Sequence, residues 1–429
     1  MKIRKWAIIL FLILFKYSAS LAQQHQIFKD NIRSLQVVAN KDWLSLPVME
    51  LGNGSLSVDF DDMGHEYHRY TYSVEHCEAN WQVSSSLFES DYIEGFATDN
   101  TIDDIQESTL TNTLYTHYHL NIPNEKCRPK ISGNYILTVF DSSHQKVFRA
   151  CFMITEPKEK GMGIALKVIT NTDATINNSH QQVEMELNYG KYSITNPNEQ
   201  IKTVLLQNKR WDIARWNAKP QYVMSDGLKW IHNQDYIFLA GNEYRKFEIL
   251  STGVATMGIE HIYWDGQEFH AYPFISIPRP NYLFDEDANG SFLIRNSDNI
   301  NNETESDYMT VHFQLKSPYI PDGEIFVNGD WTNGDFSDKY KLTFNESEML
   351  YHLEIPLKLG YYSYQFLKKD KFGKSHFLPS EGSYYQTENS YQALIYYREQ
   401  GARTDRLVGY KSVNFIARLQ VPKRSAIKE

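Results

Sequence analysis

Apolar and polar residues alternate along most of this chain with a period of two. Leu56, Val58 and Phe60, for example, are separated by serine and aspartate residues. Successive side chains of a β-strand point to opposite faces, so this pattern predicts strands with one buried face. The same alternation recurs at residues 70–77, 114–122, 135–139, 183–187 and 351–357, and residues 147–154 are expected to be the hairpin partner of the strand at 135–139. The chain is therefore predicted to be all-β.

The predicted strands group into two to three tandem β-sandwich units of immunoglobulin-like type. A charged, glycine-containing stretch at residues 156–163 separates a first unit, residues 23–157, from a second unit, residues 163–299. We expect a third unit with a C-terminal extension at residues 300–429. In the second unit, an Asp265-Gly266 pair lies between two aromatic strands and predicts a hairpin turn.

Residues 1–22 are predicted to be a signal peptide. Basic residues at positions 2, 4 and 5 precede an unbroken apolar run at 6–15, and Ser20 and Ala22 are small residues that suit cleavage. The apolar run is shorter than the about 20 residues that span a bilayer. An uncleaved membrane anchor is the alternative. Cleavage after Ala22 would leave 407 of the 429 residues, a length typical of two to three domains.

The mature chain is expected to be acidic and rich in aromatic residues. The whole sequence has a net charge of −10, and loss of the signal peptide, with four basic residues and no acidic one, lowers it to −14. Such a charge argues against nucleic acid or anionic lipid as a partner. Aromatic residues make up 14% of the sequence, and an excess of tyrosine suits surfaces that contact protein or glycan.

A long excursion at Glu78–Phe96 follows the predicted strand at residues 70–77. It places Trp81, Tyr92 and Phe96 among serine and acidic residues. Loops longer than about a dozen residues are uncommon in compact domains and are often functional. We therefore expect these three aromatic residues to contact a partner.

Two further tryptophans are candidates for partner contact. Trp264 and Trp331 each lie beside an aspartate in a predicted turn, where an indole can be partly exposed. The alternative for all five aromatic candidates is that they close the ends of the sandwiches.

Several blocks of the sequence resemble the plug protein family of the type IX secretion system. The first three blocks are HCEANWQVSSSLFESDYIEGF at His76–Phe96, YTHYHLNIPN at Tyr115–Asn124 and SGNYILTVF at Ser132–Phe140. Further similar blocks lie at residues 282–295, 305–313 and 395–410. The resemblance implies a periplasmic protein, associated with the inner face of the outer membrane, that closes the pore of the giant translocon barrel when no cargo is engaged.

The third unit has a weaker and more local likeness to a second group. Its Pro321–Trp331 segment and its Gly360–Phe366 strand are similar to immunoglobulin-like early-set modules that occur beside sugar-acting enzymes, some of which bind glycans. A periplasmic or surface glycan-binding protein is therefore the alternative function.

The sequence nominates no catalytic, cofactor or metal site. Asp285, Asp287, Asn289 and Gly290 match the first half of a calcium loop, but the twelfth position is Asn296 where a glutamate is needed. His117 and His119 share one face of a predicted strand that we expect to face solvent or another chain, and no local carboxylate or cysteine completes a metal site. Nucleophile motifs and phosphate-binding glycine loops are absent from the sequence.

The three cysteines leave the disulfide question open. Cys77, Cys127 and Cys151 are an odd number in a chain predicted to be exported, and one bridge with any of the three pairings is compatible with the spacing. The sequence thus predicts a non-catalytic binding or occluding protein.

Overall fold

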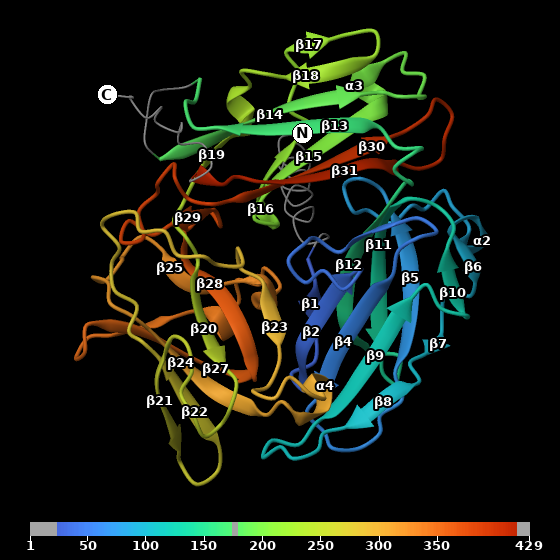
Figure 1. The fold of residues 1–429 in the computed structure, drawn as a ribbon. Helices are drawn as coiled ribbons and strands as arrows, with labels where there is room; N and C mark the ends of the chain where they lie inside the picture. The colour runs from blue at the N-terminus through green and yellow to red at the C-terminus, as the bar shows by residue number, and fades with distance from the viewer. Residues whose placement is uncertain (1–23, 174–178, 418–429) are drawn as a thin grey trace, which may run out of the picture.

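The computed structural model describes residues 24–173 and 179–417. The predicted signal peptide, residues 1–22, lies outside the described residues. Within the described ranges the regular secondary structure is almost all β-strand, as the alternation predicts, and no helix there is long and apolar enough to cross a membrane. The strands form three sandwiches, which Figure 1 shows at the right, at the top and at the left of the molecule.

The N-terminal sandwich comprises residues 24–156. Its inner sheet has the order β1-β12-β11-β5-β7 with β3 beside β12, and its outer sheet has the order β2-β4-β9-β8. The two sheets enclose an apolar core that includes Phe60, Tyr118 and Phe148. The elements are β1 (Gln26–Ile27), β2 (Ile32–Ala39), β3 (Val48–Glu50), β4 (Leu56–Asp62), β5 (Thr71–Cys77), α2 (Glu89–Tyr92), β6 (Ile93–Gly95), β7 (Asn100–Thr101), β8 (Asp104–Glu107), β9 (Thr116–Ile122), β10 (Cys127–Pro129), β11 (Gly133–Phe140) and β12 (Lys146–Thr155).

The middle sandwich is built from two distant parts of the chain, residues 163–239 and 390–415. One sheet has the order β13-β14-β18-β17 with β19 beside β14, and the other has the order β16-β15-β30-β31. In Figure 1 the red strands β30 and β31 lie beside the green β15. The elements are β13 (Gly163–Ile169), β14 (His180–Asn188), α3 (Pro197–Gln200), β15 (Ile201–Gln207), β16 (Arg210–Trp216), β17 (Tyr222–Val223), β18 (Gly227–Trp230), η1 (Gln234–Tyr236), β19 (Ile237–Leu239), β30 (Ser390–Tyr397) and β31 (Arg406–Asn414).

The inserted sandwich, residues 245–378, lies between those two parts in sequence. Its sheets are β20-β28-β23, with β25 and β29 also pairing with β28, and β21-β22-β24-β27-β26. The predicted Asp265-Gly266 turn joins β21 to β22 in a hairpin. The elements are β20 (Arg245–Ile249), β21 (Ile259–Trp264), β22 (Phe269–Pro273), β23 (Phe292–Ile294), α4 (Asn302–Glu305), β24 (Tyr308–Leu315), β25 (Glu324–Asn328), η2 (Asp330–Thr332), η3 (Asp338–Tyr340), β26 (Thr343–Asn345), β27 (Leu350–Lys358), β28 (Gly360–Lys369) and β29 (Ser375–Phe377).

The expected boundary between residues 299 and 300 does not follow these sheets. It falls between β22 and β24, which pair in one sheet, and it assigns β30 to a different unit from its partner β15. The third sandwich is an insertion, and the strands after it return to complete the second one.

The sheet that contains β15 and β30 is covered on both faces. On one face, Leu205 and Ile395 belong to the core of the middle sandwich. On the other face, Val204 and Leu394 pack in a separate apolar cluster with residues of the N-terminal sandwich, including Met153 of β12. This double burial explains why these two strands are nearly continuous apolar runs where most strands of the chain alternate.

Candidate functional site

The N-terminal and middle sandwiches meet in an apolar cluster edged by charged residues. Trp81 is 2% exposed in this cluster, and its ring lies edge-on to Trp211 of β16 with the centroids 5.7 Å apart. Beside it, the buried Asp405 accepts hydrogen bonds from the backbone N–H of Ala79 at 3.0 Å and from Lys202 Nζ at 2.7 Å. The excursion at Glu78–Phe96 is therefore fastened to the neighbouring sandwich at its start.

A buried ion pair joins the N-terminal sandwich to the inserted one. Nζ of Lys358 lies 2.6 Å from Oδ2 of Asp61, and both side chains are at most 2% exposed. Asp61 also accepts hydrogen bonds from Nδ1 of His117 at 2.7 Å and from the hydroxyl of Tyr308 at 2.7 Å. Burial alone would raise the pKa of Asp61, but Lys358 and His117 lower it below the usual range. Burial opposes protonation of His117, yet the neighbouring carboxylates of Asp59 and Asp61 raise its pKa to about 9.

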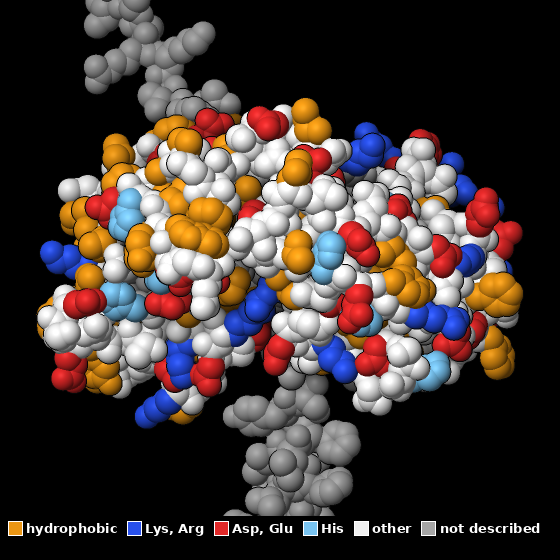
Figure 2. Space-filling model, turned by 90° about the horizontal axis from the view of Figure 1, so that it is seen from below, with side chains coloured by type: hydrophobic (Ala, Val, Ile, Leu, Met, Phe, Trp, Pro, Cys, Tyr) orange, Lys and Arg blue, Asp and Glu red, His pale blue; other side chains and the backbone are white. Residues whose placement is uncertain are grey.

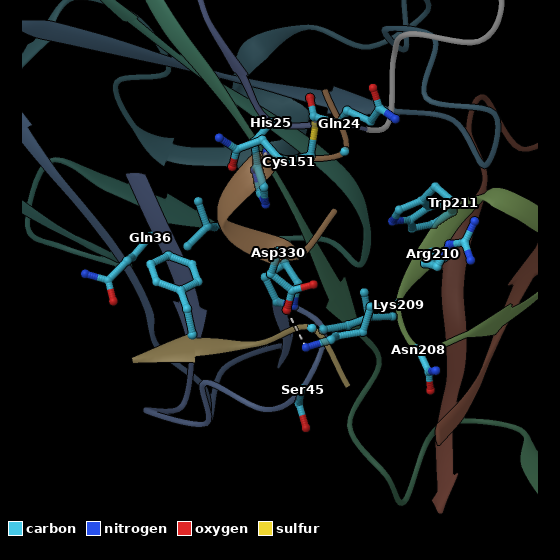
Figure 3. Close-up of a pocket in the computed structure, with 18 of the residues that line it drawn as sticks. Gln24, His25, Gln36, Ser45, Cys151, Asn208, Lys209, Arg210, Trp211 and Asp330 are labelled. Atoms are coloured by element: carbon cyan, nitrogen blue, oxygen red, sulfur yellow. Dashed lines mark hydrogen bonds and ion pairs between the residues drawn. The ribbon is translucent and has the colours of Figure 1, made fainter. Parts of the chain in front are cut away.

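A cavity of about 150 Å³ lies where the three sandwiches meet, and each of them contributes to its wall. Figure 3 shows His25 and Cys151 from the N-terminal sandwich, Lys209 from the turn before β16, and Asp330 from the inserted sandwich. Lys209 is 7% exposed and forms an ion pair with Asp330. The cavity is smaller than the 300–1,000 Å³ typical of ligand pockets. We interpret it as a small gap between the units that the ion pair of Lys209 and Asp330 bridges.

Two titratable groups of this cavity, His25 and Cys151, are held in unreactive forms. Burial lowers the pKa of His25 to about 4, so its imidazole is neutral at physiological pH. Burial raises the pKa of Cys151 to about 12. A thiol with that pKa is not ionised near neutral pH, and the thiolate is the nucleophilic form of cysteine.

Three of the five predicted contact residues are buried. Trp81 is 2% exposed, Tyr92 8% and Trp331 7%. Trp331 stacks on Phe313 in the core of the inserted sandwich. Their burial agrees with the alternative interpretation, in which the aromatic residues close the sandwiches. Buried side chains cannot contact a partner at the surface. A single sequence cannot distinguish the two cases, because the same indole beside a polar turn residue suits both.

The other two candidates, Phe96 and Trp264, are on the surface. Phe96 is 70% exposed and follows β6, at the right edge of Figure 1, whereas Trp264 is 42% exposed on the hairpin β21–β22 at the lower left. A third exposed apolar stretch, not predicted from the sequence, is the segment 274–284 that follows β22. Phe274 is 61% exposed there, Ile277 59% and Leu283 80%. The sequence offered one signal for this exposed segment. Its apolar residues lie among prolines and do not alternate with polar residues as they would in a half-buried strand.

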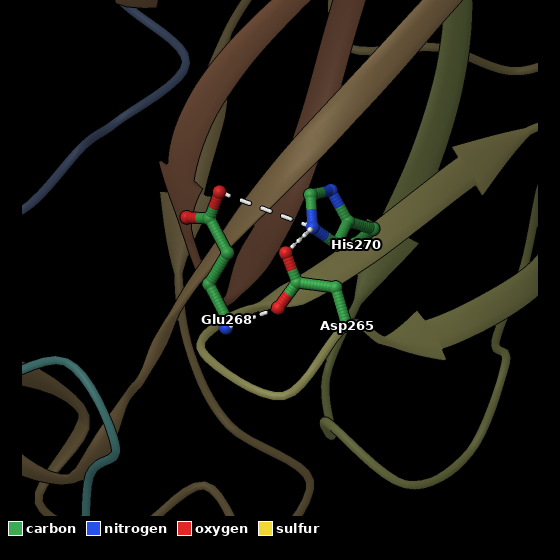
Figure 4. A group of neighbouring side chains, drawn as sticks. All are labelled: Asp265, Glu268 and His270. Carbon is green, nitrogen blue, oxygen red and sulfur yellow. Dashed lines mark hydrogen bonds and ion pairs between the residues drawn. The ribbon is translucent and has the colours of Figure 1, made fainter.

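The turn of the hairpin β21–β22 brings two carboxylates and an imidazole together. Nε2 of His270 lies 3.1 Å from Oδ2 of Asp265 and 3.9 Å from Oε1 of Glu268, and Figure 4 shows the three side chains pointing toward one another. Backbone N–H groups of Glu268 and Gln267, together with His270, lower the pKa of Asp265 to about 2. In Figure 2 hydrophobic and histidine side chains lie side by side on the half of the surface formed by the inserted sandwich.

The other positions considered for metals and disulfides are occupied by structural contacts. Asp287 accepts hydrogen bonds from the backbone N–H groups of Tyr244 and Asn289, so the calcium-like motif serves a turn. His117 is 4% exposed and does not face solvent, because the inserted sandwich covers its strand face. The three cysteines are buried, and none of them forms a disulfide bond.

The fold and its internal contacts define a class of protein: three β-sandwiches joined by buried apolar and ionic contacts. Comparison with known families places the chain more closely. The family model described as "Type 9 secretion system plug protein 1st domain" matches residues 32–156, which lie within the N-terminal sandwich. The chain belongs to the type 9 secretion system plug protein family.

One solved structure is similar over almost the whole chain. The crystal structure of a hypothetical protein from Parabacteroides merdae ATCC 43184 matches 92% of this chain and 100% of its own, with 35% sequence identity and a TM-score of 0.88. The likeness extends beyond residues 32–156 to all three sandwiches. No curated protein matches the chain.

Proposed function

We propose that this protein is a non-catalytic plug that closes the periplasmic side of the type 9 secretion translocon, an outer-membrane barrel, when no cargo is engaged. The observation that carries the proposal is the fastening of the three sandwiches to one another, in a chain whose first domain matches the plug family. A stopper must keep its shape against an open aqueous channel, and this chain has buried contacts at each junction.

Those contacts argue for a body that moves as one unit. Domains of one chain move relative to each other by default unless their interface is large and apolar. Here an apolar cluster joins the first two sandwiches, and a buried ion pair joins the first to the third. The inserted sandwich is also connected to the middle one through both of its chain ends, which restricts hinge motion further.

Contact with the barrel is proposed to be reversible and to use a few aromatic anchors. Such interfaces have moderate area and a small number of residues that supply most of the binding energy. Phe96 and Trp264 remain candidates because they are exposed, and their elements lie at opposite sides of the molecule in Figure 1. A body seated inside a ring-shaped wall meets that wall on opposite sides.

The test is the permeability of the outer membrane in a cell that makes the translocon. The gene is deleted, and entry of a bulky antibiotic that the outer membrane normally excludes is measured. We expect entry to rise and the wild-type gene to restore the barrier. Unchanged entry in a deletion strain that still contains the barrel would contradict the proposal.

A pair of variants tests the anchors separately. F96A/W264A is expected to restore the barrier less well than wild type and to co-purify with the barrel in lower yield. The matched control is Y319A/F372A, which removes two aromatic side chains that are 62% and 80% exposed elsewhere on the inserted sandwich. Equal restoration by both variants would exclude Phe96 and Trp264 as anchors.

Glycan binding is the second candidate, and one observation favours it. Tyr263 and Trp264 are 56% and 42% exposed next to each other on a hairpin. Exposed aromatic faces of this kind can lie against sugar rings. Retardation of the purified protein in gels that contain a polysaccharide, lost in Y263A/W264A, would support glycan binding over the plug function.

A further inference from the structure

We propose that Asp265, Glu268 and His270 form a binding site for a divalent first-row transition-metal ion of the zinc class on the hairpin β21–β22. The site lies apart from the buried contacts that join the sandwiches, and the inference is independent of the proposed plug function. It rests on how the ligand atoms converge and on the hydrogen bonds behind them.

The three ligand atoms lie within 4.8 Å of one another, close to the spacing around a bound metal ion. Zinc binds histidine nitrogen and carboxylate oxygen at about 2.0–2.2 Å, which in tetrahedral geometry places ligand atoms about 3.4 Å apart. Here Nε2 of His270 is 3.1 Å from the Asp265 oxygen and 3.9 Å from the Glu268 oxygen. One imidazole with two carboxylates is a donor set that suits zinc and its neighbours better than calcium, which takes oxygen ligands.

A hydrogen bond behind His270 fixes its ring. Nδ1 of His270 is hydrogen-bonded to Nε2 of His312 at 2.8 Å, and Nδ1 of His312 lies 3.2 Å from Glu354. The ring of His270 is therefore held through Nδ1, and Nε2 is the atom that lies near Asp265 and Glu268.

A divalent ion fits on the Nε2 side of His270. Nε2 and one oxygen each of Asp265 and Glu268 lie close together, and an ion between them would bind all three. Metal-binding histidines commonly donate their other N–H to an acceptor that fixes the ring. His312 is such an acceptor, so it is a positioning residue.

The surroundings give the site a place to bind and a route for the ion. The side chains of Asp265 and Glu268 are 37% and 50% exposed, whereas His270 is 14% exposed and fixed by its neighbours. Glu268 is also oriented by Thr310, whose hydroxyl donates to Oε2 at 3.1 Å. Solvent can fill the remaining coordination positions. A bound ion would tie the turn that carries Asp265 to strand β22.

Isothermal titration of the chelator-treated protein with Zn²⁺ tests the proposal. We expect one saturable site that Ca²⁺ does not compete for. H270A and D265N are both expected to abolish it, and D265N changes only an exposed side chain, so loss of folding would not explain its effect. H312F is expected to weaken binding about 10- to 100-fold, as loss of an outer-shell partner typically does.

The matched control is H232A. His232 forms a surface pair with Asp173 at 2.8 Å, and no second carboxylate or other metal-binding side chain converges on that pair among the residues that the structure describes. We expect H232A to bind Zn²⁺ like wild type. The proposal is overturned if H270A and D265N keep wild-type affinity, if H232A loses binding equally, or if no saturable binding occurs.

Discussion

Replacement of Lys358 by methionine tests how the N-terminal and inserted sandwiches are held together. The Nζ atom of Lys358 lies 2.6 Å from Asp61 and 2.6 Å from the carbonyl oxygen of Glu303, with 2% of its side chain exposed. K358M keeps most of the volume but leaves the buried Asp61 carboxylate without its cation. Removal of one partner of a buried ion pair costs about 3–5 kcal/mol. Asp61 keeps its bonds from His117 and Tyr308, so we expect a loss of about 3 kcal/mol, at the lower end of that range.

Urea unfolding followed by tryptophan fluorescence measures this loss. With a slope of about 3 kcal/mol per molar urea, a loss of about 3 kcal/mol lowers the midpoint of the affected transition by about 1 M. The double variant D61N/K358M removes both charges and should regain part of the stability. If the double variant is no more stable than K358M, the uncompensated charge of Asp61 is not the cause of the stability loss in K358M.

The control is K246M, which breaks an ion pair of the same length at the surface. Nζ of Lys246 lies 2.6 Å from Asp285, whose side chain is 58% exposed. Exposed pairs contribute about 0–1 kcal/mol, so the midpoint should move little. If K358M and K246M shift the midpoint equally, the ion pair between the sandwiches does not fasten them as described above.

Three further measurements test side chains that the structure buries. His117 has a folded pKa of about 9 against an ordinary 6.5, so its stabilising contribution is complete below pH 6.5 and is lost as pH rises through 9. The urea midpoint of the wild type should therefore fall over this pH range, by an amount that corresponds to up to about 3 kcal/mol, and the midpoint of H117Q should not show this fall. W81A should cost about 3–5 kcal/mol and W264A less than about 0.5 in the same assay, and equal losses would contradict the assigned burial. A thiol reagent should modify no cysteine of the folded protein and three after unfolding, and a reductant should leave the midpoint unchanged.

Local pattern predicted the strands well because one buried face imposes a period of two. The strand that contains Leu56, Val58 and Phe60 became β4, and the Asp265-Gly266 pair became a hairpin turn. The pairing of distant strands could not be predicted in the same way, because alternation says that a face is buried but not what covers it. The pairing of β15 with β30 joins residues on either side of a whole inserted sandwich.

One signal of this arrangement was present in the sequence. The run Val204-Leu205-Leu206 and the run Ala393-Leu394-Ile395 are continuously apolar, and such runs are typical of strands buried on both faces. This feature of the sequence was not used in the prediction above. The identity of the second covering layer required the structure, which places the N-terminal sandwich there.

The candidate contact residues and the proposed metal site depend on three-dimensional context. Trp81 and Trp264 each have a polar residue beside them, Asn80 and Asp265, but only the second tryptophan is on the surface. Asp265, Glu268 and His270 are close in sequence, yet His312, which orients His270, comes from strand β24, and no spacing rule connects it to the hairpin.

The most direct test of the plug function is the ionic conductance of the purified translocon barrel in a planar bilayer. Addition of the protein to the periplasmic side is expected to reduce the conductance of the open barrel, reversibly and in proportion to occupancy. The plug function is contradicted if the protein binds the barrel and the conductance stays at the level of the open pore.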